Sequence, residues 1–388
     1  MVLKEIRFIR NKGEKNEWRI EGKPDESGIA QPLTLENINL IVGLNASGKS
    51  RTVDAIRRIA DLVSGEVKLS NLKGMRFDTV QYSLKFEDEK EIINYFIEIK
   101  HGKIVQEILE IDGTEKLNRK LELGTLYYES ENKDLDFQID DDILAISKRD
   151  NKQHPFFEGI YLWGKNLNHF KFGGQLGQKT LIKDSNEDFK INLKDGNNVA
   201  EIFVTAKKKF DDFEKIVLQD LKAVSYHIKK VDVLETKIYS QSLFSLQVKE
   251  LDVDSFIDQI DISQGMFRAL SLLIQLHYSL LSKESSCILI DDIGEGLDFE
   301  RSKALIDLII KKVENSTVQV IMTTNDRFTM NKVPLKYWSV IERLPKKSVF
   351  YNYKNSKEVF DDFDDLGLNN FDFLSSQFYI KGFETVAP

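Results

Sequence analysis

The spacing of apolar residues divides the start of the chain into short strands and one helix. Residues 2–10 and 18–22 are predicted as two strands. Residues 38–42 (INLIV) form a continuous apolar run, which is typical of a strand buried on both faces. Residues 50–63 then repeat apolar side chains every three or four positions, which predicts a helix. A buried strand followed directly by a helix is the first sign of an α/β core.

A two-residue period replaces the helical one between residues 77 and 111. Apolar side chains alternate with polar ones from Val80 to Phe86, and again over 95–99 and 104–111. The short turn at 101–103 joins two of these runs, so we predict an antiparallel hairpin or meander. Residues 112–190 show little periodicity, and they include an acidic stretch at 134–142 and a Gly-rich stretch at 173–177.

The second half of the chain returns to alternating helices and strands. Residues 198–230 are predicted to be helical and basic, and 243–251 alternate like a strand. Four further elements follow, which are a helix at 265–281, a buried strand at 287–290, a helix at 301–313 and a buried strand at 318–322. Strands that alternate with helices near both ends predict an α/β core with a parallel sheet, and the middle of the chain is one large insertion.

Composition narrows the class of protein. The 388 residues are 41% hydrophobic and 30% charged, which is typical of a soluble globular protein. The net charge of −8 does not favour a protein that coats a nucleic acid. It does not exclude a local basic groove that binds one. The single cysteine, Cys287, excludes an intramolecular disulfide and a cysteine-based zinc site. A charged N-terminus and the lack of a long apolar run lead us to expect a cytoplasmic protein that spans no membrane.

The strongest chemical motif is the sequence GLNASGKS at 43–50, between the buried strand and the helix. This is the phosphate-binding pattern G-x-x-x-x-G-K-S in its expected strand–loop–helix context. Glycines let backbone amides curl around phosphates, Lys49 reaches the β- and γ-phosphates, and the Ser50 hydroxyl is a Mg²⁺ ligand. The predicted nucleotide-binding residues here are Gly43, Asn45, Ala46, Ser47, Gly48, Lys49, Ser50 and Arg51.

A second motif is the apolar strand at 287–290 that ends in Asp291 and Asp292. In a Walker B arrangement Asp291 holds the Mg²⁺ shell, and Asp292 stands where a water-orienting carboxylate is needed. Taken alone, the pattern also fits an ordinary buried strand that ends in an acidic turn. The phosphate-binding motif earlier in the chain favours the functional interpretation.

The third motif, ISQGMFR at 262–268, begins a strongly apolar helix. Ser263 is a natural N-cap, which is a purely structural explanation. The backbone at a helix N-terminus also suits a γ-phosphate presented by another molecule.

With these motifs in this order, the chain resembles the ABC-type ATPases. The segment 294–298 is similar to their D-loop, and 321–326 lies where they have a switch segment. The resemblance implies the fold class α/β, a P-loop ABC-type ATPase head with a mixed sheet, an antiparallel β-subdomain and a helical insertion. It also implies ATP and Mg²⁺ as cofactors and a homodimer or higher homo-oligomer, in which each ATP lies between Lys49 of one head and Ser263 of another. Gln264, Gly265 and Asp298 complete the implied nucleotide site.

Within that family the chain resembles the stand-alone AAA-type and OLD-type ATPases of bacterial defence systems, without their TOPRIM nuclease. It departs from the family pattern at three places. The usual catalytic Glu is Asp292, the usual switch His is Asn325, which donates hydrogen bonds but carries no charge, and the signature reads Ser-Gln-Gly. The catalytic residues are therefore expected to be Asp292, Lys49 and Asn325, with slow turnover. Gln81 is the best candidate for a Mg²⁺-sensing glutamine, next to the metal ligands Ser50 and Asp291.

These patterns predict four segments. Residues 1–111 are the first half of the ATPase head, 112–250 an insertion, 251–345 the second half of the head, and 346–388 a tail. The tail mixes acidic and aromatic residues, and we expect it to pack on the head rather than dock a partner.

Three functions stay open from the sequence. The first is a sensor ATPase of a prokaryotic defence or DNA-processing system that acts through a separate nuclease or toxin effector. The second is a RecF-like or chromosome-maintenance-like repair ATPase, whose lysines at 207–209 and 229–230 bind nucleic acid directly. The third is a scaffold that binds ATP with little turnover.

Overall fold

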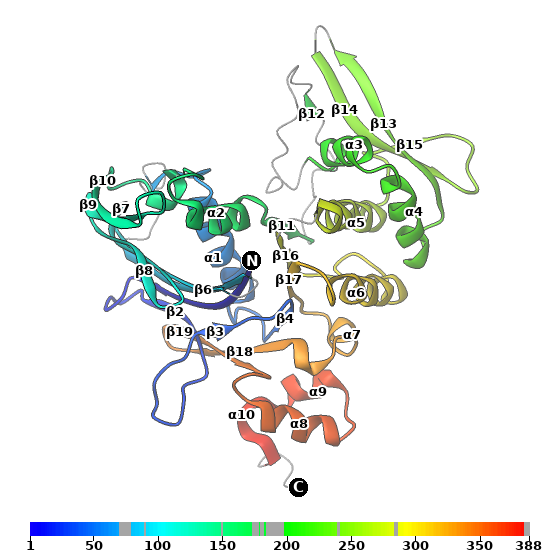
Figure 1. The fold of residues 1–388 in the computed structure, drawn as a ribbon. Coiled ribbons are helices and arrows are strands. Elements are labelled where there is room, and N and C mark those ends of the chain that lie inside the picture. Colours follow the sequence, from blue (N-terminus) through cyan, green and yellow to red (C-terminus); the bar gives the residue numbers. More distant parts are fainter. Residues whose placement is uncertain are drawn as a thin grey trace. The chain divides into compact units, whose positions relative to one another are not determined.

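The computed structural model describes residues 1–69, 79–88, 91–148, 150–172, 178, 182–183, 198–238, 241–282 and 286–383. These residues form two compact units (Figure 1). Unit 1 comprises Met1–Lys165 and Pro334–Pro388, and unit 2 comprises Asn166–Val333. The Gly-rich stretch at 173–177 lies outside the described residues.

Unit 1 is built on a mixed sheet whose strand order is β10-β9-β8-β7-β6-β5-β1-β2-β19-β18-β4. The pairs β19–β2 and β18–β4 are parallel, and the other neighbours in this order are antiparallel. The strands are β1 (Val2–Arg10), β2 (Trp18–Gly22), β3 (Leu33–Thr34), β4 (Ile38–Val42), β5 (Thr79–Asp88), β6 (Glu91–Lys100), β7 (Lys103–Ile111), β8 (Thr114–Lys120), β9 (Leu123–Tyr128), β10 (Lys133–Gln138), β18 (Trp338–Leu344) and β19 (Lys347–Asn352).

Helices cover this sheet and close its core. They are α1 (Lys49–Val63), α2 (Glu158–Lys165), α8 (Lys357–Asp365), α9 (Asn370–Ser375) and α10 (Phe378–Lys381), with short 3₁₀ turns at Ala145–Lys148, Pro155–Phe157 and Leu335–Tyr337. The Tyr82 hydroxyl on β5 donates a 3.2 Å hydrogen bond to the Ala55 carbonyl of α1, which fixes that helix against the sheet. In the tail, Phe360, Phe363 and Phe373 form an aromatic cluster, and Tyr379 packs on Tyr351 of β19. The tail therefore packs on the head, as expected.

Unit 2 combines three parallel strands with a helical layer and a β-hairpin (Figure 1). The parallel strands are β11 (Asn168–Lys171), β16 (Ser286–Asp291) and β17 (Val318–Thr323). The antiparallel strands are β12 (Ile182–Lys183), β13 (Ile228–Ile238), β14 (Gln241–Glu250) and β15 (Ile257–Asp258). The helices are α3 (Val199–Lys209), α4 (Phe213–Ala223), α5 (Gln264–Ser282), α6 (Phe299–Val313) and α7 (Arg327–Met330).

Most predicted elements are found within one or two residues of their expected bounds, and the mixed α/β fold class is confirmed. The helical prediction for 198–230 is wrong at its end. Helix α4 stops at Ala223, Ser225 takes a left-handed φ of 60°, and strand β13 starts at Ile228. Lys229 and Lys230 therefore lie on a strand rather than a helix. The acidic pair Asp134 and Asp136, from the stretch at 134–142, lies exposed on strand β10.

No helix among the described residues is long and apolar enough to cross a bilayer. The longest, α5, has 19 residues, and its buried side includes Arg268 and His277.

Candidate functional site

The phosphate loop lies between β4 and α1 in unit 1, and its own backbone holds the predicted lysine. Lys49 is 7% exposed, and its Nζ donates hydrogen bonds to the carbonyl oxygens of Gly43 at 2.8 Å and Leu44 at 3.2 Å. The ammonium group is thus held by the loop itself, where partial negative charge attracts it. The phosphate oxygens of a nucleotide are stronger acceptors for the same group.

Close packing fixes the end of this loop. Gly48 has a φ of 118°, and a Cβ atom there would lie 2.7 Å from the Ser348 hydroxyl of β19. That hydroxyl is buried and donates a 2.9 Å hydrogen bond to the Ser47 carbonyl. Only glycine fits this position. Leu44, Asn45, Ala46 and Ser50 face solvent on the open side of the loop.

A cationic pocket lies beside the first three turns of α1. It is lined by Phe8, Arg10, Trp18, Arg51, Asp54, Ala55 and Arg58. The guanidinium carbon of Arg51 lies 5.7 Å from the centre of the Trp18 ring. Burial and the nearby charges of Arg51 and Arg58 lower the pKa of Arg10. The pocket thus combines three arginines with the aromatic rings of Phe8 and Trp18. These residue types suit a group that carries both a flat ring and negative charge.

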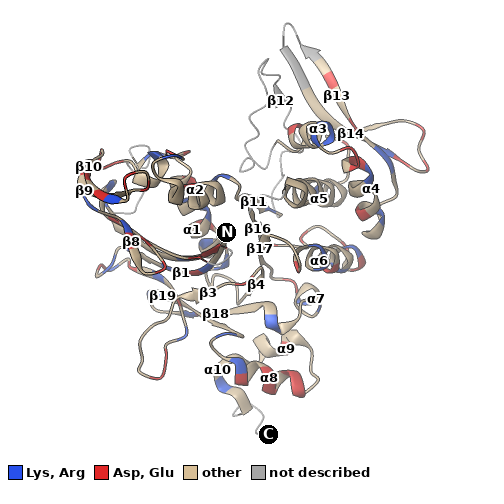
Figure 2. Cartoon of the chain, viewed as in Figure 1, with Lys and Arg blue, Asp and Glu red and all other residues tan. Residues whose placement is uncertain are grey.

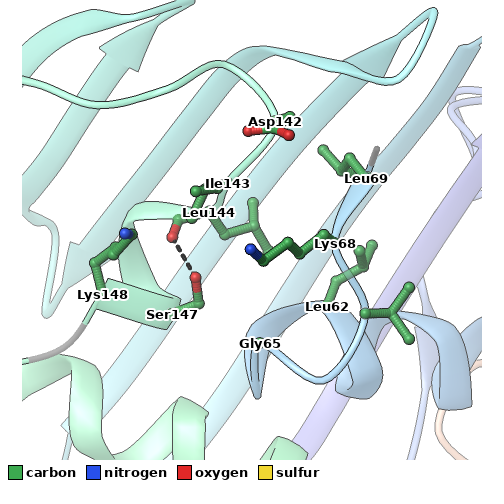
Figure 3. A pocket seen from close by; sticks show the side chains of 10 residues that line it. Leu62, Gly65, Lys68, Leu69, Asp142, Ile143, Leu144, Ser147 and Lys148 are labelled. Carbon is green, nitrogen blue, oxygen red and sulfur yellow. Dashed lines mark hydrogen bonds between the residues drawn. The ribbon is translucent and has the colours of Figure 1, made fainter. Parts of the chain in front are cut away.

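A cavity at the opposite end of α1 contains none of the predicted residues. Lys68, Lys148 and Asp142 lie at this cavity, with the leucines Leu62, Leu69 and Leu144 (Figure 3). Because α1 has 15 residues, its two ends are about 20 Å apart, so this cavity is remote from the phosphate loop.

In unit 2, the ends of two parallel strands bring together Asp292 and Asn325, two of the three predicted catalytic residues, with Asp291. Thr323, the last residue of β17, donates a 2.6 Å hydrogen bond to Oδ1 of Asp291 at the end of β16. The same hydroxyl accepts a 2.9 Å hydrogen bond from the Asp292 backbone N–H. Asn325 donates from Nδ2 to Oδ1 of Asp292 at 3.3 Å. Asp292 has a left-handed φ of 57°, so the extended backbone of β16 ends directly before it.

The signature residues and the D-loop also meet in unit 2. The Ser263 hydroxyl accepts a 3.4 Å hydrogen bond from the Met266 N–H, so it caps α5 as its position predicts. Ser263 and Gln264 are exposed. A Cβ atom on Gly265 would lie 2.9 Å from the Gly296 carbonyl oxygen, so the signature and the D-loop pack backbone to backbone.

Arg268 strengthens this contact from the first turn of α5. It is 5% exposed, and its Nη1 donates a 2.6 Å hydrogen bond to the Glu295 carbonyl. Gly296, with a φ of 78°, leaves the room for it, since a Cβ atom there would lie 2.0 Å from Nη1.

Asp298 ends the D-loop and begins α6. Its carboxylate accepts hydrogen bonds from the Arg301 N–H at 3.0 Å and from Arg301 Nη1 at 2.7 Å. These bonds lower the pKa of Asp298, with the backbone bond as the largest cause. Arg301 in turn lies over the Tyr226 ring at 4.5 Å.

Gln81 lies on β5, with Ile9 of β1 and Glu98 of β6 as its cross-strand neighbours. Burial raises the pKa of the Glu98 carboxyl group, but hydrogen bonds outweigh this effect and the pKa is lowered. The hydrogen bond from Lys100 contributes most to the lowering, and the hydrogen bond from the Gln81 side chain contributes next. Its metal-sensing role stays a prediction.

A sequence profile of one protein family covers most of the chain. The profile, described as "AAA domain, putative AbiEii toxin, Type IV TA system", matches residues 38–331. The chain belongs to this AAA family. No curated protein matches it.

Solved Smc heads share the fold of this AAA protein. A crystal structure of the Smc head bound to the C-winged helix domain of ScpA matches with a TM-score of 0.51 at 14% identity, covering 90% of this chain and 97% of that one. An Smc head domain with an extended coiled coil, bound to the C-terminal domain of ScpA and derived from Pyrococcus furiosus, has the same TM-score at 12% identity, covering 93% and 99%. The family and the fold confirm the expected ABC/AAA-type ATPase.

The residue types at the site of this AAA protein suit Mg²⁺. The ion prefers oxygen ligands and keeps several of them as water or phosphate, so a hydroxyl and one carboxylate from the protein suffice. Ser50 in the phosphate loop of unit 1 and Asp291 at the end of β16 in unit 2 each carry a side-chain oxygen of this kind. Among the described residues no cluster of three or more His, Cys, Asp or Glu side chains could hold a metal on its own.

Several residues of the candidate site escape sequence reasoning. Thr323 and Arg268 act through contacts with residues 32 and 27 positions away, and no local pattern marks such contacts. Trp18, Arg10 and Arg58 come together only because β1, β2 and α1 are neighbours in the fold. The one signal in the sequence is the polar Thr323 at the end of the mostly apolar strand β17.

Proposed function

We propose that this AAA-family ATPase binds and hydrolyses ATP in a site shared between two copies of the chain. The phosphate loop of one copy holds the triphosphate, and Ser263 of the other copy covers the γ-phosphate from the exposed start of α5. Helix N-termini favour negative charge through their free N–H groups, and both α1 and α5 present such an end. The exposure of Ser263 and Gln264 supports this proposal, because a covering residue must be accessible to another molecule.

Each residue has a proposed role. Lys49 exchanges its loop carbonyls for the β- and γ-phosphates, and Ser50 and Asp291 hold Mg²⁺, which neutralises phosphate charge when bound. Asp292 accepts a proton or a hydrogen bond from the attacking water, and Asn325 positions the Asp292 carboxylate and offers its amide to the γ-phosphate. Trp18 and the surrounding arginines support the base and ribose side of the nucleotide.

The observation that carries the proposal is the arrangement at the ends of β16 and β17. Thr323 bridges two successive aspartates, and Asn325 reaches the second of them. A simple acidic turn requires no such bridge. The hydrogen bonds orient Asp291 and Asp292 differently, which two carboxylates with separate roles require.

In the cell, we propose that the chain is the regulatory ATPase of a prokaryotic defence or DNA-processing system and acts through a separate nuclease or toxin. The description of its family as a putative toxin of a type IV toxin–antitoxin system supports a role of this kind. The same description favours a second candidate, in which the chain itself is the toxic component. Expression of the chain alone in a bacterial host separates the two, because only the second candidate arrests growth without a partner gene.

Direct binding of DNA has less support. Lys207 forms an ion pair with Glu214 at 2.7 Å, and Lys230 pairs with Asp232. Figure 2 shows acidic and basic residues on neighbouring elements α3, α4 and β13. Phosphate contacts would have to displace these acidic partners.

Lys49→Ala tests the nucleotide site. We expect ATP affinity to fall at least about tenfold and hydrolysis at least about a hundredfold, because the variant loses the only lysine in the loop. Isothermal titration calorimetry and phosphate release measure the two effects. Lys152→Ala, an exposed lysine in a different loop, is the matched control and should behave like the wild type. Unchanged hydrolysis in Lys49→Ala would contradict the proposed function.

A further inference from the structure

The segment that leads into the signature presents an exposed surface of alternating acidic and apolar residues. Leu251, Val253, Phe256 and Ile260 are between 37% and 58% exposed. Asp252, Asp254, Asp258 and Asp261 lie between them and are also exposed, and the segment 251–261 contains no Lys or Arg. Exposed large apolar side chains gathered in one short segment mark an interaction surface more often than singly scattered ones do.

This rim segment, residues 251–261, has a fixed backbone. Strand β15 pairs with β14, with Ile257 opposite Val248. Gln259 is 1% exposed, and its Oε1 accepts a 2.9 Å hydrogen bond from the Leu246 N–H. The acidic and apolar side chains are therefore presented by an ordered edge of unit 2, immediately before the exposed Ser263.

A surface of opposite charge surrounds the phosphate loop in unit 1. Arg51 and Arg343 are both exposed. Arg51 lies in the first turn of α1, directly after the loop. Arg343 lies on β18, two residues beyond Ile341, whose Cβ and carbonyl oxygen would lie 3.2 Å from a Cβ atom on Gly43 of the loop. Arg10 and Arg58 add positive charge in the neighbouring pocket. Leu44, 67% exposed at the top of the loop, supplies an apolar side chain.

We propose that the rim segment of one copy docks on the arginine-bearing surface around the phosphate loop of a second copy. This inference rests on the proposed pairing of heads. If Ser263 of one copy covers a nucleotide held at Lys49 of another, the exposed segment that leads to Ser263 is the part of unit 2 that we place at the edge of that contact. Asp252 and Asp254 belong to this segment, 11 and 9 residues before Ser263. Charges of opposite sign at such an edge steer association and reject wrong partners.

A charge-reversal design tests this docking in the full chain. In the variant Asp252→Lys/Asp254→Lys, two positive side chains would face Arg343 of the second copy. In the variant Arg343→Glu, a negative side chain would face the two aspartates of the second copy. With AMP-PNP and Mg²⁺, we expect each variant alone to pair at least about tenfold more weakly than the wild type. An equal mixture of the two variants should pair with near wild-type affinity, because both contacts of the mixed dimer then join opposite charges. Analytical ultracentrifugation measures the dissociation constants.

The control is Asp134→Lys/Asp136→Lys, which makes the same substitutions at the same spacing on the exposed strand β10. It should pair like the wild type. Rescue in the mixture shows that the single variants are folded and supports the docking. Wild-type pairing by the Asp252→Lys/Asp254→Lys variant, or a mixture as weak as its components, overturns the docking but leaves the proposed ATP sandwich intact. A wild type that binds AMP-PNP and stays monomeric overturns both.

Discussion

At the scale of single residues, the Thr323 hydroxyl is the smallest part on which the proposed chemistry depends. It donates to Asp291 and accepts from the Asp292 backbone, so it sets the position of both aspartates. A positioning residue of this kind should affect turnover more than nucleotide affinity.

Thr323→Val removes the hydroxyl and keeps the shape of the side chain. We expect kcat for ATP hydrolysis to fall about ten- to a hundredfold while the affinity for ATP changes less than about threefold, since the bridge and not the phosphate loop is lost. Steady-state kinetics and calorimetry measure both. Thr323→Ser keeps the hydroxyl and should recover most of the activity. Equal losses in the Val and Ser variants would show that the bridge has no such role.

The position of the Arg268 side chain depends on the absence of a side chain at Gly296. Gly296→Ala introduces strain at a φ of 78° and a Cβ atom 2.0 Å from Arg268 Nη1, so the Arg268–Glu295 hydrogen bond must break. We expect the substitution to lower the free energy of unfolding by about 2–4 kcal/mol, of which about 1 kcal/mol is backbone strain. Urea denaturation measures this loss.

Two comparisons separate the cost of the clash with Arg268 from the cost of the strained backbone at Gly296. Gly296→Ala should cost only about 1 kcal/mol in an Arg268→Ala background, where the guanidinium is absent. Gly367→Ala, at a φ of 65° with open space around it, should cost about the same. Identical costs for Gly296→Ala in both backgrounds would refute the proposed clamp between the signature helix and the D-loop.

At the scale of elements, one buried carboxylate joins three helices of unit 2. Oδ2 of Asp220 on α4 lies 2.5 Å from His277 Nε2 on α5 and 2.9 Å from Lys312 Nζ on α6. Burial opposes ionisation, but the hydrogen bonds from His277 and Lys312 outweigh it, and the pKa of Asp220 is lowered. The helix that carries the signature and the helix that follows the D-loop are thus fixed to the same residue.

The lowered pKa gives this contact a predictable pH dependence. A carboxyl group with a depressed folded-state pKa stabilises the fold fully above its ordinary pKa of about 3.9, and this contribution is lost as the pH falls through the folded-state value. Asp220→Asn should therefore cost about 1–3 kcal/mol at pH 7 and progressively less below about pH 4. Urea denaturation at several pH values measures the difference. The exposed Asp307→Asn on α6 is the control. A cost that stays constant down to pH 3 would contradict the ionised network.

The elements also show how far the sequence alone can lead. Strands β4, β16 and β17 are evident from short, mostly apolar runs, because burial on both faces leaves a local signature in the sequence. The first three residues of β13, 228–230, are predicted as helix because the register of the strand shifts between Ile228 and Lys230, so the alternation of buried and exposed residues is broken where the strand begins. Strands β8 to β10 are hard to predict because few of their side chains are buried.

The same distinction applies to the candidate site. Residues 43–50 and the strand before Asp291 are contiguous, so a motif contains them. The bridge through Thr323 and the clamp through Arg268 join segments that are distant along the chain. Such contacts exist only after the strands and helices have taken their places in the fold.

At the scale of the whole molecule, the proposed activity depends on two copies. The phosphate loop belongs to unit 1, and the signature, Walker B strand, D-loop and switch belong to unit 2. In the proposed dimer, the phosphate loop of one copy and the signature of the other enclose each ATP. A two-fold symmetric pair then contains two equivalent sites, each of which needs residues from both chains.

Complementation between two inactive variants tests this central claim most directly. Lys49→Ala removes the phosphate-binding lysine, and Ser263→Arg blocks the signature, so neither variant alone should hydrolyse ATP. Mixed in equal amounts, they should form dimers with one intact site, and phosphate release should recover to about a quarter of the wild-type rate if the two sites act independently. A mixture as inactive as each variant alone, with both variants folded, would contradict an ATP site shared between two copies.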